Sequence, residues 1–169
     1  ISPGLILSAA VMPDPDSAAR YYAQDWKDWL ERGLVDYVCP MNYSTDIAKF
    51  RESLDVGDRT GFSEKIVMGI RAWNNNGDSL VPNVLARNYN IMDVAERIGE
   101  IRKRDFAGIA LFSYDGLLKD SALQHLSRLA YSDEIIANLS ALDPLGESTA
   151  RTRFAADVKV STEGRLYSL

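Results

Sequence analysis

The stretch that decides the fold is Val35-Asp36-Tyr37-Val38-Cys39-Pro40-Met41-Asn42-Tyr43, near the start of a chain of 169 residues. It is an apolar run of strand length that lacks regular polar alternation. Strands of this kind are typical of parallel sheets, in which both faces of each strand are covered. We therefore predict a buried strand here and look for neighbours of the same character.

Three other segments resemble it, and helix-length amphipathic segments lie between them. The predicted strands cover residues 5–12, 35–43, 65–73 and 108–114, and the predicted helices cover about 16–32, 46–57, 91–104 and 119–131. The strand starts are 30, 30 and 43 residues apart, which are natural lengths for βα units. The extra length of the third unit lies in a loop over 74–90. The sequence thus predicts an α/β fold with four βα units in succession.

Composition excludes several classes of function. The net charge is −5 and the longest basic run is Arg102-Lys103-Arg104, which argues against nucleic-acid binding. No apolar stretch approaches the roughly 18 residues of a membrane span. The single cysteine, Cys39, excludes an internal disulfide and a cysteine-based zinc site, and the single histidine, His125, excludes a multi-histidine metal site.

The two ends of the chain differ from its middle. Ile1-Ser2-Pro3-Gly4 has no initiator methionine and no targeting signature, so we expect the chain to be part of a longer polypeptide. The alternation around Val158 and Val160, followed by a Glu163-Gly164 turn, predicts a β-hairpin within residues 155–169. We predict one domain over 1–132 and a C-terminal extension, or a linker into a following module, over 133–169.

Four βα units are compatible with an open doubly wound sheet or with half of a (β/α)8 barrel. A complete barrel needs about 200 residues or more, so this chain cannot hold one. None of the strand ends is a glycine-rich phosphate loop of the kind that nucleotide-binding sheets carry. They carry aromatic, amide, guanidinium and carboxylate side chains instead, which suit the faces and hydroxyls of sugars. Barrel active sites lie at this carboxyl end of the strands.

The order of these strand ends resembles the glycoside-hydrolase-like family 10 group of bacterial (β/α)8-barrel proteins, and Pro40-Met41-Asn42-Tyr43 resembles the M-x-Y strand end of chitinase-like barrels. The matching stretches are 8–11, 24–26, 29–30, 33–43, 65–69 and 108–114. Over about residues 4–131, the resemblance implies the C-terminal half of a TIM barrel, strands five to eight, followed by a short tail. It also implies a glycoside hydrolase that cleaves a polysaccharide by general acid–base chemistry. The key carboxylates of related families usually follow strand four, which would precede Ile1.

Candidate site residues follow from the strand ends. Asp115 is the candidate catalytic residue, as an acid, a base or a ligand of a sugar hydroxyl, with capping of the next helix as the alternative. Asn42 and Tyr43 are candidates to position a sugar or a carboxylate, or they close the end of the sheet. Arg71 is expected to face a carboxylate or the substrate, because an uncompensated charge on an apolar strand is costly.

Three aromatic or acidic residues complete the candidate substrate-binding set. Trp73 offers a stacking face for a sugar ring, although packing at the rim is an equal alternative. Tyr114 follows the last predicted strand. Asp14 is a further candidate, and capping of the first helix is the favoured reading for it.

Two alternatives to hydrolysis stay open. One is a non-catalytic carbohydrate-binding barrel, and the other is a self-contained α/β binding domain that dimerises to cover its sheet edges. The expected partners are a carbohydrate and either an N-terminal half-barrel or a second copy of the chain. No metal or other cofactor is expected, because acid–base hydrolysis needs none. Related polysaccharide hydrolases often act outside the cytoplasm, so an extracytoplasmic location is the corresponding expectation.

Overall fold

Four parallel strands alternate with helices in the first part of the chain. The computed structural model describes residues 4–74, 79–81, 88–130, 158–160 and 166–168. The strands are β1 (Ser8–Val11), β2 (Tyr37–Asn42), β3 (Val67–Arg71) and β4 (Gly108–Phe112). The helices are α1 (Pro15–Tyr22), α2 (Trp26–Glu31), α3 (Ile47–Arg59), α4 (Ile91–Arg102), α5 (Tyr114–Leu118) and α6 (Ala122–Ala130), with short 3-10 turns at Ser63–Lys65 and Lys119–Ser121. Each strand lies within its predicted range, so the α/β prediction is confirmed.

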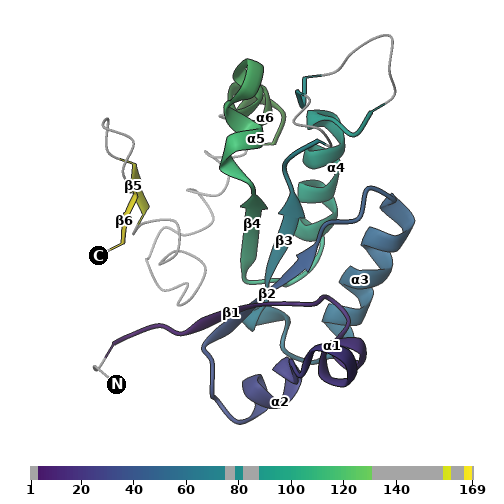
Figure 1. Cartoon of the computed structure of the whole chain (residues 1–169), viewed down its shortest axis with the longest axis vertical. Helices are drawn as coiled ribbons and strands as arrows, with labels where there is room; N and C mark the ends of the chain where they lie inside the picture. The colour runs from purple at the N-terminus through teal and green to yellow at the C-terminus, as the bar shows by residue number, and fades with distance from the viewer. Residues whose placement is uncertain (1–3, 75–78, 82–87, 131–157, 161–165, 169) are drawn as a thin grey trace. The chain divides into compact units, whose positions relative to one another are not determined.

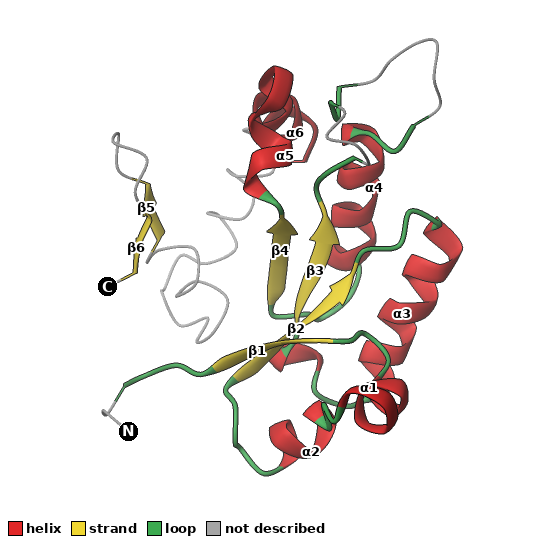
Figure 2. Cartoon of the chain, viewed as in Figure 1, coloured by secondary structure: helices red, strands yellow, loops and turns green. Residues whose placement is uncertain are grey.

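The strands form one sheet in the order β1-β2-β3-β4. All three neighbouring pairs are parallel, with Ala10 beside Cys39, Met41 beside Gly69 and Gly69 beside Ala110. The strand order therefore follows the chain order and does not reverse as it does in a doubly wound sheet. Figure 1 shows the strands turning from β1, which crosses the view, to β4, which runs up it. Figure 2 shows α3 and α4 along one face of this twisted sheet.

Burial is uneven between the two faces of the sheet, which differs from the predicted burial of both faces. In β2, Val38, Pro40 and Asn42 are buried, whereas the alternate residues are only half-buried. In β1, Ser8 and Ala10 are exposed. Since side chains alternate between faces along a strand, one face lies under the helices and the other is partly open in the described part of the chain.

The core lies between the sheet and the helices. Met68 and Ile70 of β3 are at most 1% exposed and belong to the same buried set as Phe50 of α3 and Val94 and Ile98 of α4. The helix ends are set locally. Asp46 caps α3 by accepting hydrogen bonds from two backbone N–H groups, and a capping box of the Asn90 and Asp93 side chains starts α4.

The prediction of one continuous helix over 16–32 is wrong, because two helices replace it. Ala23 ends α1 in the left-handed conformation, with φ of 54°. The break brings two side chains to the end of β1. The Gln24 Oε1 atom accepts a hydrogen bond from the backbone N–H of Met12 at 2.9 Å, and the indole N–H of Trp26 donates to the Met12 carbonyl oxygen at 3.0 Å. A straight helix would not place both groups on Met12.

The prediction of one helix over 119–131 also needs correction. A helical turn, α5, already begins at Tyr114, and Asp120 and Ser121 adopt positive φ before α6 starts at Ala122. Residue 131 lies outside the described residues. As a result, Asp115 stands in the first turn of α5 and Ser113 is the N-cap.

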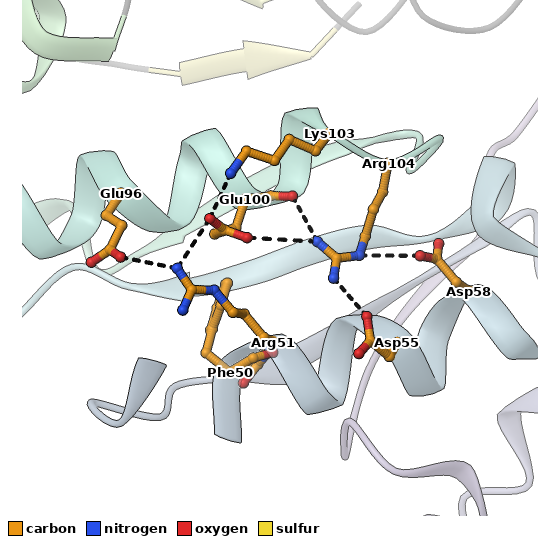
Figure 3. Close-up of polar contacts among 9 residues, drawn as sticks. Phe50, Arg51, Asp55, Asp58, Glu96, Glu100, Lys103 and Arg104 are labelled. Atoms are coloured by element: carbon orange, nitrogen blue, oxygen red, sulfur yellow. Dashed lines mark hydrogen bonds and ion pairs between the residues drawn. The ribbon is translucent and has the colours of Figure 1, made fainter. Parts of the chain in front are cut away.

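A surface network of ion pairs joins α3 to α4 (Figure 3). Arg51 bridges Glu96 and Glu100, each at 3.2 Å, and Arg104 reaches Asp55 at 2.6 Å. The pairs of Arg104 with Asp58 and Glu100, and that of Lys103 with Glu100, are 3.1, 3.9 and 2.8 Å long. The network connects the two helices around Glu100, which is 9% exposed, and its more exposed pairs contribute only modestly to stability.

The chain divides into two compact units, residues 1–130 and 131–169. In the second unit, β5 (Val158–Val160) and β6 (Leu166–Ser168) pair antiparallel, which confirms the predicted hairpin. Within the described parts of both units, no helix has the length and apolar character needed to cross a membrane.

Candidate functional site

Three aromatic rings meet at the carboxyl end of the sheet. The ring centroids of Tyr43 and Trp73 are 5.0 Å apart, and those of Trp73 and Phe112 are 5.6 Å apart, both in edge-to-face geometry. Tyr43 stacks on Phe112 with an interplanar angle of 17°. These distances are typical of favourable aromatic pairs. Phe112 is 55% exposed, so the cluster presents an accessible ring to solvent.

Arg71 lies against this aromatic cluster. Its guanidinium carbon is 4.7 Å from the Trp73 ring centroid, and its Nε donates to the Trp73 carbonyl oxygen at 2.9 Å. The guanidinium carbon also lies 5.5 Å from the centroid of the Tyr89 ring. Both rings lie within the distance at which a cation and an aromatic ring attract each other, and the expectation that Arg71 faces a carboxylate or the substrate stays a prediction.

An open cavity of about 320 Å³ lies beside the aromatic cluster. Its lining residues come from the ends of β3 and β4 and from α5 with the turn after it. They are Trp73, Asn74, Phe112, Ser113, Asp115, Gly116 and Lys119. Asp115 and Lys119 are exposed, so an acceptor and a donor group of opposite charge stand at the rim of an aromatic wall.

Glycine at position 116 allows α5 to lie close to β3. A Cβ at this position would be 1.9 Å from the carbonyl oxygen of Ala72. The backbone of α5 therefore approaches the end of β3 more closely than a residue with a Cβ atom would allow.

Asn42 lies on the other face of the sheet. Its side chain is 2% exposed, and its Nδ2 donates to the carbonyl oxygen of Phe50 in α3 at 3.1 Å. This hydrogen bond agrees with the alternative role expected for Asn42, in which it closes the end of the sheet, here against α3. Asn42 and Tyr43 are adjacent in the sequence, but Asn42 is the last residue of β2 and contacts α3, whereas Tyr43 follows the strand and joins the aromatic cluster.

Asp14 and Tyr114 are not among the residues that line the cavity. The Asp14 Oδ1 atom accepts a hydrogen bond from the backbone N–H of Ser17 at 2.8 Å, so Asp14 is the N-cap of α1. Tyr114 is the first residue of α5 and is 59% exposed. Of the predicted site residues, the structure thus brings together Tyr43, Arg71, Trp73 and Asp115.

Sequence reasoning missed three residues that shape the site. Phe112 is the last residue of β4 and pairs with Arg71 of β3. Alternation of side chains along the strand was the signal that could have found it, because residues paired in a sheet lie on the same face. Asn74 is buried, and its Nδ2 donates to the carbonyl oxygens of Ser79 and Tyr89. Tyr89 had no signal in the sequence, because 18 residues separate it from Arg71, whose carbonyl oxygen accepts a hydrogen bond from its hydroxyl at 2.8 Å.

Burial is the main cause of the pKa shifts of the tyrosines at the site. It raises the pKa of the Tyr43 phenol above its ordinary value, with a smaller contribution from Cys39. Burial also raises the pKa of Tyr89, to about 12. Both phenols are therefore protonated donors at neutral pH. Within the described residues, no group of three or more His, Cys, Asp or Glu side chains could hold a metal ion.

Comparisons with protein-family models, with curated proteins and with solved structures found no match for this chain. We therefore infer function from the residues and geometry of the site. The site combines an aromatic cluster and the Arg71 guanidinium with an open cavity that the Asp115 carboxylate lines.

Proposed function

We propose that the carboxyl edge of the sheet binds a carbohydrate and that the chain is the C-terminal half, strands five to eight, of a (β/α)8-barrel glycoside hydrolase. The observation that carries the proposal is the meeting of Tyr43, Trp73 and Phe112 beside the cavity that Asp115 lines. Aromatic rings offer sugars a flat apolar face, and the polar groups at the rim offer partners for hydroxyls. Asp115 is the proposed catalytic residue of this half.

The topology supports the barrel part of the proposal. Consecutive parallel strands in chain order are the arrangement within any four neighbouring strands of a (β/α)8 barrel. Right-handed crossovers then place the connecting helices on one face and leave the other face for the barrel interior. In the proposed barrel, the partly open face that carries Ser8 and Ala10 would line that interior. A second copy of the chain, or another half-barrel, would complete it.

A second candidate is non-catalytic carbohydrate binding by this chain. Glycosidases of either stereochemistry ordinarily use two carboxyl groups, at most about 9.5 Å apart. Asp115 is the only carboxylate among the described residues that line the cavity, and the other predicted acid, Asp14, caps α1. Binding without hydrolysis is the expected behaviour unless another half-barrel supplies the second acid.

Titration of the 169-residue chain with cellohexaose, chitohexaose and maltohexaose tests the site. We expect binding of at least one hexasaccharide, and we expect Phe112→Ala to weaken it at least about tenfold because a stacking face is lost. Tyr22→Ala is the matched control, since Tyr22 is 56% exposed and belongs to α1. Weakening by both variants alike would remove the site from the aromatic cluster, and no binding of any hexasaccharide would overturn the proposal.

Release of reducing ends from the bound hexasaccharide distinguishes the two candidates. Hydrolysis that Asp115→Asn abolishes, without a change in affinity, supports the catalytic role. Binding without hydrolysis favours non-catalytic binding only if it persists after another half-barrel has supplied a second carboxylate, because the chain alone lines the cavity with Asp115 as its one described carboxylate. Hydrolysis that survives Asp115→Asn would contradict the assignment of Asp115.

A further inference from the structure

Five side chains that alternate between aromatic rings and guanidinium groups run from the candidate site to α3. They are, in order, Trp73, Arg71, Tyr89, Arg97 and Phe50. From cation to ring centroid, the successive distances are 4.7, 5.5, 4.9 and 5.3 Å. All lie within the range of about 6 Å over which a cation and an aromatic face attract each other. We call these five residues the cation–π line.

Arg97 of α4 is the buried cation of this line, with 1% of its surface exposed. Its guanidinium donates to the carbonyl oxygens of Asp93 at 2.9 Å, Thr45 at 2.8 Å and Ser44 at 3.3 Å. Ser44 and Thr45 directly follow Tyr43, which belongs to the aromatic cluster. One side chain of α4 therefore holds the backbone that leaves the site at the end of β2.

Burying an arginine side chain among neutral hydrogen-bond acceptors has a high desolvation cost, so it contributes little net stability to the fold. An apolar side chain of similar volume commonly gives equal or greater stability at such a position. The guanidinium instead makes directional contacts. It donates hydrogen bonds in fixed directions to carbonyl oxygens, and its planar group stacks on aromatic rings. For Arg97 those rings are Phe50 and Tyr89.

Tyr89 connects Arg97 to the end of β3. Its ring lies between the guanidinium groups of Arg97 and Arg71, and its hydroxyl donates to the Arg71 carbonyl oxygen at 2.8 Å. Its own carbonyl oxygen accepts a hydrogen bond from Asn74, the residue after Trp73. Tyr89 is thus attached to the end of β3 at both its side chain and its backbone.

We propose that Arg97 is a positioning residue of the candidate site: through Tyr89 it sets the position of Arg71 and Trp73, and through Ser44 and Thr45 it sets the backbone after Tyr43. The importance of this coupling for ligand binding rests on the proposed function. The coupling between Arg97 and Trp73 is independent of the ligand and can be measured without one.

Fluorine NMR of the full chain labelled with 5-fluorotryptophan tests the coupling. The chain has three tryptophans, and Trp73→Phe identifies the signal of Trp73. We expect Arg97→Met, which keeps the volume and removes the fork, to shift the Trp73 signal and leave that of Trp26 in place. Arg51→Met is the matched control, because Arg51 contacts the same helix through Glu96 and Glu100 but is not part of the cation–π line.

A folded Arg97→Met protein with an unshifted Trp73 signal would overturn the proposal. Should that variant fail to fold, Tyr89→Leu interrupts the line at a half-buried position, and an unshifted Trp73 signal in this variant overturns it equally. The hexasaccharide that wild type binds should bind Arg97→Met about fivefold more weakly, the effect of one cation–π contact. If wild type binds no hexasaccharide while Arg97→Met still shifts Trp73, the proposed function fails and the coupling stands.

Discussion

Gly116→Ala tests the geometry on which the candidate site depends. Gly116 is the third residue of α5 and packs on the backbone that leaves β3. A Cβ at this position would lie 1.9 Å from the carbonyl oxygen of Ala72, 2.9 Å from its carbonyl carbon and 3.0 Å from the Cα atom of Trp73. All three are backbone atoms, so no side chain can rotate to make room. The variant therefore has to move α5 away from β3.

The size of the effect follows from two opposing contributions. The added carbon comes more than about 1 Å closer than Cβ atoms normally approach, and overpacking of this kind costs about 1–3 kcal/mol. Alanine is otherwise favoured over glycine within a helix by about 0.5–1 kcal/mol. Because the clash involves main-chain atoms, we expect the loss to exceed this gain and the free energy of unfolding to fall by about 1–2 kcal/mol.

Urea unfolding followed by circular dichroism measures this difference. Gly99→Ala in α4 is the matched control, because a Cβ at position 99 would have no heavy atom within 4 Å. The control should gain about 0.5–1 kcal/mol from helix propensity alone. A Gly116→Ala protein that is stabilised like the control would refute the close approach of α5 to β3, and with it the described cavity.

Three further perturbations test other parts of the structure. Glu100 has its pKa lowered from 4.5 to about 2 by hydrogen bonds from basic side chains, so its stabilising contribution is complete above pH 4.5 and is lost as pH falls toward 2. The stability difference between wild type and Glu100→Gln should therefore disappear over that interval in urea titrations. Asn42→Ala should lower the free energy of unfolding by about 0.5–1.5 kcal/mol, since it removes the hydrogen bond that the Asn42 side chain donates to the Phe50 carbonyl oxygen. Asp14→Ala should cost about 1 kcal/mol in the same assay through loss of the cap on Ser17.

Each of these predictions has a result that contradicts it. A Glu100→Gln difference that is constant from neutral pH to pH 2 would show that the ion pairs do not perturb this carboxyl. Asn42→Ala with wild-type stability but weakened hexasaccharide binding would return Asn42 to the ligand site. Asp14→Ser should retain the cap, so equal loss in Asp14→Ser and Asp14→Ala would contradict the capping role.

The βα order could be predicted from the sequence because it is a local property. Apolar runs of strand length marked the sites of β1 to β4, and Asp46 marked the start of α3. The break after α1 was not predictable, since Ala23 in a left-handed conformation has no signature and is held by contacts of Gln24 and Trp26 with Met12. Long-range hydrogen bonds decided that local conformation.

The site divides in the same way. The residue types at the strand ends, Tyr43, Arg71, Trp73 and Asp115, were visible in the sequence, and so was the expectation that parallel strands gather them at one edge. Their mutual distances were not, because register, face and helix approach depend on packing between distant segments.

What the sequence determined by itself was therefore the class of fold and the chemical character of one sheet edge. Periodicity and residue type are encoded within a few neighbouring positions. Only the tertiary structure decided that Asn42 faces α3, that Phe112 completes the aromatic cluster and that Arg97 reaches the site through Tyr89. These outcomes depend on contacts across 8, 69 and 8 positions of sequence, respectively, and on the exact faces that meet when helices pack on a twisted sheet.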